Sequence, residues 1–202
     1  FTPSVKKALE KAKTLGIKII APGHGPVYRK NPQKIIADYA RFTRYAEGAG
    51  KREVTILWGS MYGMTAKAVA FAESILQREG VRYNKLEMPL ESESEMVATV
   101  FKSAGIIIAA PTYEYKLFPP VATALNELGR KRITGKLAFR FGSYGWSGGA
   151  EKELQEIMER NKMNWDLVES VEFEGAPKKE DLMKVEAGVM ALIKKMGNKV
   201  VE

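Results

Sequence analysis

The chain has 202 residues, of which 45% are hydrophobic and 28% are charged, a composition typical of globular proteins. This length allows one complete α/β domain with a smaller appendage, but it is short for two complete domains. The absence of cysteine excludes disulfides, thiolate-bound zinc, iron–sulfur clusters and a cysteine nucleophile. No apolar run approaches the roughly 18 to 20 residues of a membrane helix. We therefore expect a soluble protein located in the cytoplasm.

The formal net charge is +8, with a pI near 9.5, which favours acidic partners or a phosphorylated ligand. Lys and Arg are mixed with Glu along the predicted helices and form no block of five or six like charges, a pattern typical of a solvated surface. The sequence begins at Phe1 with neither an initiator Met nor a leader. We expect it to be a piece of a longer chain.

The first 46 residues predict a helix, a strand, an irregular loop and a second helix. Thr2 and Pro3 start a helix that Gly16 ends, and the apolar run Ile17–Ile20 predicts a buried strand. The segment Ala21–Pro26 contains two prolines and two glycines, which exclude regular structure. Next, Asn31-Pro32 predicts the start of a helix that runs to about Ala46.

After a linker at residues 47–51, the pattern becomes strand, loop and helix, repeated five times. Strands are expected at Val54–Trp58, Val81–Met88, Gly105–Ala110, Lys136–Gly142 and Val168–Phe173. Helices are expected at Thr65–Glu79, Ser92–Ser103 (with a Ser92/Glu95 capping box), Pro120–Arg130, Ala150–Asn161 and Glu180–Met196. The third strand is apolar on both faces and should lie at the centre. This order predicts an α/β fold with a flavodoxin-like, doubly wound, five-stranded parallel sheet.

Ligands of such sheets bind beyond the carboxyl ends of the strands, where the strand order switches direction. The loop after the first strand, Gly59–Thr65, supplies the hydroxyls of Ser60 and Thr65 and free N–H groups at the start of a helix. It therefore predicts a phosphate site, without a Walker motif or a Gly-x-Gly-x-x-Gly fingerprint. The alternative is a polar turn whose hydroxyls only cap the helix.

The loops after the third and fourth strands, 111–115 and 143–149, combine aromatic rings with small residues. Aromatic faces stack on flat heterocycles, and exposed backbone amides bind the polar edge of such a ring. Three loops of this kind at one crevice predict a flavin. The alternative is that the aromatic side chains simply cover the end of the core; these are Tyr62, Tyr113, Tyr144 and Trp146.

Together, the segments Ser60–Thr65, Pro111–Tyr115 and Ser143–Ala150 resemble the FMN site of the flavodiiron proteins, also called A-type flavoproteins. The N-terminal Pro22–Pro26 motif, followed by Asn31-Pro32, resembles the end of that family's metallo-β-lactamase-like domain. The resemblance implies three parts. Residues 1–46 would be a remnant of that domain, residues 47–51 a linker, and residues 52–202 the flavodoxin-like FMN-binding domain.

The resemblance assigns the cofactor contacts to three sets of residues. Those at the phosphate loop are Ser60, Met61, Tyr62, Gly63, Met64 and Thr65. Those expected at the flavin ring and ribityl chain are Pro111, Thr112, Tyr113 and Glu114. Those expected at the ring alone are Ser143, Tyr144, Gly145, Trp146 and Gly148. Glu114 departs from the Pro-Thr-x-Asn form common in the family. A carboxylate there would disfavour a reduced anionic flavin unless it points to solvent.

The implied function is an FMN electron-transfer module that takes electrons from an acidic donor such as rubredoxin, or from a flavin reductase. In the complete protein, the electrons would pass to a diiron centre that reduces oxygen or nitric oxide. His24 matches the last histidine ligand of that centre, but a chain with one His cannot build it alone. No catalytic residue is therefore assigned. The family also pairs head to tail, so a homodimer is expected.

Other functions remain open at this stage. A stand-alone FMN-dependent NAD(P)H oxidoreductase acting on quinones or similar small acceptors has the same fold, although no dinucleotide fingerprint accompanies the loops. A nucleic-acid-binding domain would use the positive charge, but no known motif is present. A metallo-hydrolase fails on ligand count. We therefore expect neither nucleic acid nor a membrane as a partner.

Overall fold

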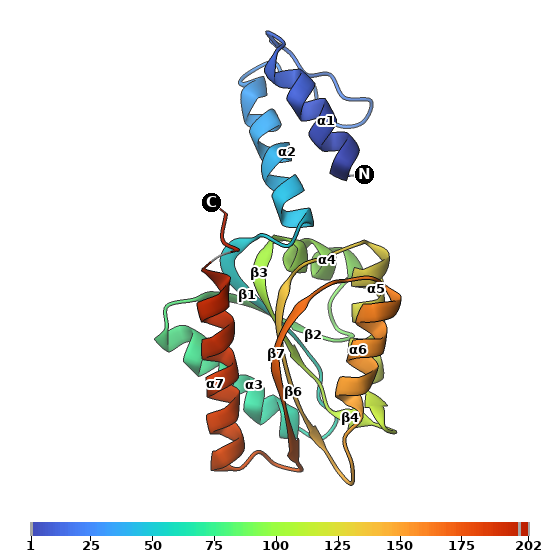
Figure 1. Ribbon diagram of the computed structural model, residues 1–202, viewed down its shortest axis with the longest axis vertical. Helices are drawn as coiled ribbons and strands as arrows, with labels where there is room; N and C mark the ends of the chain where they lie inside the picture. The colour runs from blue at the N-terminus through green and yellow to red at the C-terminus, as the bar shows by residue number, and fades with distance from the viewer. Residues whose placement is uncertain (1, 198, 202) are drawn as a thin grey trace.

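Figure 1 shows the computed structural model of the chain, which describes residues 2–197 and 199–201. A helical arm, residues 2–46, stands on one end of an α/β unit with a central sheet. The last described residues, 199–201, lie beside the place where the arm joins the unit, where Val200 forms a bridge with Gly50. Within the described residues, no helix is long and apolar enough to span a membrane.

The arm consists of α1 (Thr2–Lys13) and α2 (Pro32–Ala46), joined by an irregular loop. The Asn31 side chain accepts a hydrogen bond from the Lys34 N–H, as expected of a residue that starts a helix. The strand predicted at Ile17–Ile20 is wrong, because this run makes only an isolated bridge between Ile20 and Tyr28. The arm has no sheet to receive the run, and Ile19 is 51% exposed.

The sheet of the α/β unit has five parallel strands in the order β2-β1-β3-β6-β7. Their bounds are β1 (Lys51–Trp58), β2 (Arg82–Glu87), β3 (Ser103–Ala109), β6 (Leu137–Tyr144) and β7 (Asp166–Glu174). The strand order switches direction between β1 and β3, since β2 lies on one side of β1 and the later strands on the other. The predicted flavodoxin-like, doubly wound sheet is confirmed.

Five helices cover the two faces of this sheet (Figure 1). One face packs against α3 (Met64–Arg78) and α7 (Lys179–Met196), and the other against α4 (Glu93–Lys102), α5 (Pro119–Arg130) and α6 (Ala150–Arg160). From Ile106 to Ala109, successive residues of the buried strand β3 alternate between the two cores. Burial on both faces explains why this strand is a continuous apolar run.

Two local features differ from the sequence prediction. A short antiparallel hairpin, β4 (Thr112–Tyr113) and β5 (Lys116–Leu117), follows β3 and was not predicted. At α4, the Ser92 hydroxyl accepts the Glu95 N–H at 3.2 Å, as expected of a capping box. In a complete capping box, the Glu95 carboxylate would accept the Ser92 N–H. Here it accepts from the Thr99 hydroxyl at 3.3 Å, one turn further along the helix.

The segment between arm and unit, residues 47–51, is firmly packed. The Gly50 N–H donates to the Lys199 carbonyl at 3.0 Å, and the Gly50 carbonyl accepts from the Val201 N–H at 2.8 Å. The buried Lys136 ammonium donates to the carbonyls of Ala49, Phe101 and Ser103 at 2.9, 2.8 and 3.0 Å. This amine therefore joins the segment to the α/β unit.

Candidate functional site

A pocket of about 470 Å³ lies at the carboxyl end of the sheet, beside the switch point between β1 and β3. It brings together all three loops that the sequence singled out. Predicted residues that line it are Met61, Tyr62, Met64, Pro111, Thr112, Tyr113, Glu114, Ser143, Tyr144, Gly145 and Trp146. Three lining residues were not predicted: Tyr115, Ser147 and Gly175. The predicted residues that do not line it are Ser60, Gly63, Thr65 and Gly148.

The first loop leads into the N-terminus of α3. Gly63 precedes the helix with a positive φ of 77° and provides no side-chain cap. The Ser60 hydroxyl accepts the Gly63 N–H at 3.1 Å, which holds the loop closed. The first N–H groups of a helix have no partners inside it. The start of α3 therefore offers backbone donors and the positive end of the helix dipole to an anion.

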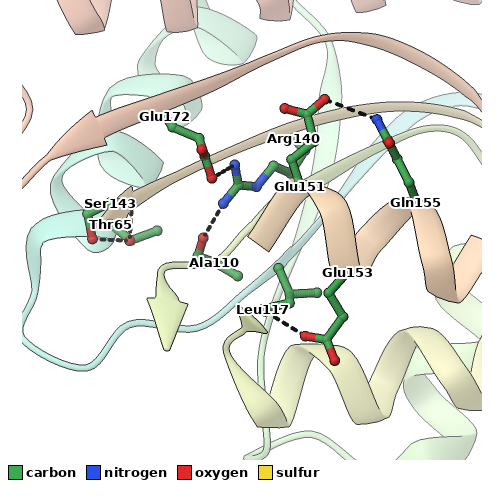
Figure 2. A network of polar contacts seen from close by, with 9 residues as sticks. All are labelled: Thr65, Ala110, Leu117, Arg140, Ser143, Glu151, Glu153, Gln155 and Glu172. Atoms are coloured by element: carbon green, nitrogen blue, oxygen red, sulfur yellow. Dashed lines mark hydrogen bonds and ion pairs between the residues drawn. The ribbon is translucent and has the colours of Figure 1, made fainter. Parts of the chain in front are cut away.

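Thr65, whose hydroxyl was expected at the phosphate site, does not line the pocket. Its side chain is fully buried, and its hydroxyl lies 3.0 Å from that of Ser143 (Figure 2). It also accepts the Ser143 N–H at 3.3 Å. Thr65 thus fastens the start of α3 to the end of β6. Its hydroxyl is directed at the protein and not at the pocket.

The second loop is the β4–β5 hairpin. Its two central residues, Glu114 and Tyr115, have φ values of 48° and 61°, the left-handed conformations of a type I′ turn. The Leu117 N–H donates to the Glu153 carboxylate of α6 at 2.6 Å, which anchors the hairpin (Figure 2). Thr112 lines the pocket, and its hydroxyl oxygen is buried without a hydrogen-bond partner among the described residues. An unpartnered buried hydroxyl at a pocket wall is a group that a polar ligand would satisfy.

Aromatic side chains form the rim of the pocket. Trp146 is 100% exposed, Tyr62 83% and Tyr115 73%. Side chains this exposed do not cover the end of the core. The alternative that Trp146 and Tyr62 simply cover the core is therefore wrong. Large exposed rings around a concave site are typical of a binding surface.

His24 lies exposed in the loop between α1 and α2. Across the described ranges, no three His, Asp or Glu side chains are grouped so that they could hold a metal ion.

No family model matches the chain. It is 29% identical over 186 residues to a nitric oxide reductase of Moorella thermoacetica, covering 91% of this chain and 46% of the relative. It is 34% identical over 138 residues to an anaerobic nitric oxide reductase flavorubredoxin of Vibrio vulnificus, covering 67% of this chain and 27% of the relative.

Among solved structures, a flavodiiron protein of Giardia intestinalis superposes with a TM-score of 0.85 and 27% identity, covering 98% of this chain and 49% of that one. Rubredoxin oxygen:oxidoreductase of Desulfovibrio gigas also reaches a TM-score of 0.85, at 23% identity, and covers 98% of this chain and 49% of its own. An archaeal flavodoxin superposes with a TM-score of 0.61 at 20% identity, covering 72% of this chain and 99% of its own.

The sheet order and the pocket at its switch point define an α/β domain of the flavodoxin-like class. The chain is a homologue of the flavodiiron proteins and nitric oxide reductases, so the predicted resemblance is confirmed. It spans about half or less of the length of these relatives. They support an FMN-binding module of a flavodiiron-type oxidoreductase and do not favour the stand-alone NAD(P)H oxidoreductase.

Proposed function

We propose that residues 52–202 bind FMN in the pocket at the switch point and act as an electron-transfer module. The observation that carries this proposal is the convergence of three loops on one pocket, whose wall holds the unpartnered Thr112 hydroxyl. Its volume of about 470 Å³ falls within the range of cofactor sites. FMN, when bound, would supply the one- and two-electron chemistry, and the chain would position it.

Each part of the pocket has a separate task in this proposal. The Ser60–Met64 loop and the free N–H groups at the start of α3 bind the phosphate. Tyr113, Tyr144 and Trp146 line the ring side, and Thr112 donates to or accepts from a polar group there. Thr65 contributes indirectly, because it fixes the position of Ser143.

The proposal for the complete protein extends the family resemblance. Residues 1–46 would be the end of a metallo-β-lactamase-like domain and residues 47–51 the link to the flavodoxin-like domain. The module would pass electrons to a diiron centre that reduces oxygen or nitric oxide, with His24 as a ligand only there. The names of the relatives, nitric oxide reductase and rubredoxin oxygen:oxidoreductase, support this reading.

An acidic carrier such as rubredoxin, or a flavin reductase, is the proposed electron donor, and the cytoplasm the proposed location. The relatives' names include rubredoxin, which supports the first donor. A head-to-tail homodimer is proposed as well. The exposed aromatic rim around the pocket supports it, because such a patch fits a protein surface.

The test is the visible absorption spectrum of the purified chain, with mass analysis of whatever denaturation releases. A two-banded flavin spectrum with one FMN per chain is the expected result. Ser60→Ala should weaken FMN binding about tenfold, through the lost hydroxyl and the loosened loop. Ser94→Ala, at an exposed serine of α4, is the matched control and should bind as the wild type does. A colourless chain that takes up no added FMN would contradict the proposal.

A further inference from the structure

Arg140 is the one charged residue of the buried strand β6. Its side chain is 0% exposed, and its neighbours in the strand, Phe139 and Phe141, are core residues. Removing a guanidinium from water is costly unless partners compensate it. Burial lowers the pKa of Arg140, and the nearby Glu172 carboxylate opposes this shift. The partners that compensate the buried guanidinium of Arg140 therefore indicate its role in the structure.

Arg140 contacts two partners, the Glu172 carboxylate of β7 and the backbone of Ala110 (Figure 2). Its Nη1 donates to Glu172 Oε1 at 2.6 Å, and its Nη2 donates to the Ala110 carbonyl oxygen at 3.3 Å. Ala110 immediately precedes Pro111, which begins the hairpin loop of the pocket. One end of the guanidinium thus holds the backbone at the start of the second loop.

The other partner, Glu172 on β7, lies against the third loop. A Cβ placed on Gly148 would come within 2.2 Å of Glu172 Oε2. The Glu172 carboxylate therefore lies close to the backbone of the 145–149 loop at Gly148. The ion pair of Arg140 and Glu172 therefore lies between the two loops that form the ring side of the pocket, and neither residue lines the pocket.

We propose that Arg140, together with Glu172, is a positioning residue that sets the spacing of the two ring-side loops of the flavin site. This inference rests on the proposed FMN binding. The pair acts through the hydrogen bond to the Ala110 carbonyl and through the close approach of Glu172 to Gly148. The phosphate loop, Ser60–Met64, is closed by the hydrogen bond from the Gly63 N–H to the Ser60 hydroxyl, which does not involve the pair.

The experiment compares binding of FMN and riboflavin, which lacks the phosphate, by variants of both regions. Arg140→Met and Glu172→Gln should each weaken binding of both flavins about tenfold and leave the ratio of the two affinities unchanged. Ser60→Ala should weaken FMN binding alone. The matched control is Lys136→Met, which removes a second buried basic side chain at the residue immediately before β6, where it contacts the carbonyls of Ala49 and Ser103. Once folded, this variant should bind both flavins as the wild type does.

The reduction potential of the bound flavin gives a readout that general loosening would not produce. Arg140→Met leaves the Glu172 charge unpaired and should lower the potential, whereas Glu172→Gln leaves the cation unpaired and should raise it. A tenfold change in the affinity ratio of two redox states differing by one electron corresponds to 59 mV. Arg140→Lys keeps the charge, so it should keep the potential near that of the wild type. It also provides a second variant if Arg140→Met does not fold.

Three outcomes are decisive. Tenfold losses for both flavins, with potential shifts of opposite sign, support the inference. Folded Arg140→Met, Arg140→Lys and Glu172→Gln proteins that bind both flavins with wild-type affinity overturn it while leaving the proposed function intact. A wild-type chain that binds neither flavin overturns the proposed function, and this inference with it.

Discussion

The arm and the α/β unit both contain amphipathic helices, but these helices differ in what they cover. Helix α1 of the arm buries no residue, whereas α7 of the unit buries five against the sheet. Leu15, Ile19 and Val27 of the arm are all about half exposed or more. Amphipathic pattern alone therefore does not make a core, because the apolar face also needs a surface to pack against.

The two regions differ as strongly in charge. Residues 1–52 contain twelve Lys and Arg and three Asp and Glu, which gives a net charge of +9. Residues 53–202 contain 20 Lys and Arg and 21 Asp and Glu, which gives a net charge of −1. The +8 of the whole chain therefore belongs to the arm and its junction. It says little about the surroundings of the pocket, where Glu114 is exposed. An acidic donor would be attracted to the arm more strongly than to the flavin site.

The largest expected effect is a loss of unfolding free energy when a methyl group is added at a glycine of the close-packed α/β unit, compared with the same change in the open arm. A Cβ on Gly142 would lie 1.7 Å from the Ala110 carbonyl oxygen, which is backbone of a neighbouring strand. Gly142→Ala should therefore lower the free energy of unfolding by about 4 kcal/mol or prevent folding. Gly23→Ala in the arm, with no atom within 4 Å, should change it by less than about 0.5 kcal/mol. Urea denaturation measures both, and similar losses would contradict the comparison.

The next effect concerns the contact between the regions. Tyr45 of α2 is 1% exposed and meets Phe101 of α4 edge to face, with ring centroids 5.8 Å apart. Tyr45→Ala should cost about 3 kcal/mol of unfolding free energy. The control is Tyr39→Ala on the same helix, where the ring is 53% exposed and the loss should stay below about 1 kcal/mol. Thermal and urea unfolding would show it, and an equal loss at Tyr39 would argue against a packed junction.

A further effect should depend on pH. Burial, and secondarily the charge of Lys199, lower the pKa of Lys136 from its ordinary 10.5 to about 7. Between these values, the unfolded chain binds the proton more tightly than the folded chain. Stability should therefore rise with pH from about 7 to 10.5, by at most about 1.4 kcal/mol per unit. The wild type is compared with Lys136→Met in urea at several pH values, and a constant difference would refute the shift.

The smallest effect tests where the charge resides. Neutralising Lys11 and Lys18 of the arm with Gln should weaken retention on an immobilised polyanion and change FMN affinity by less than about twofold. The matched control neutralises Lys67 and Lys152, two exposed lysines of the α/β unit. It removes the same charge but should affect retention less. Equal retention of the two double variants would show that the arm does not dominate polyanion binding.

Much of the fold follows from the sequence because buried parallel strands leave long apolar runs. The central run at β3 and the helices between strands were enough to predict the sheet and its ligand-binding edge. The same reasoning failed at Ile17–Ile20. A short apolar run shows hydrophobicity, but not whether a sheet exists to receive it.

The candidate site shows the same division between pattern and contact. Aromatic and glycine-rich loops are visible in the sequence, and the structure brings them to one pocket. The β4–β5 hairpin was missed because its turn, Glu114–Tyr115, lacks the Asn or Gly that usually marks a type I′ turn. Arg140 was missed because a single charge in a strand normally faces solvent. Its hydrogen-bond partners lie 30 and 32 residues away in the sequence.

The full exposure of Trp146 makes the pocket directly observable by its own fluorescence. The sequence contains three tryptophans, and the other two are sheltered: Trp165 is 6% exposed and donates to the Ile133 carbonyl, and Trp58 is partly buried. A collisional quencher such as iodide should therefore reach Trp146 first. Any molecule that enters the pocket will protect this ring. The chain thus carries an intrinsic optical probe at its site, which reports occupancy without a label.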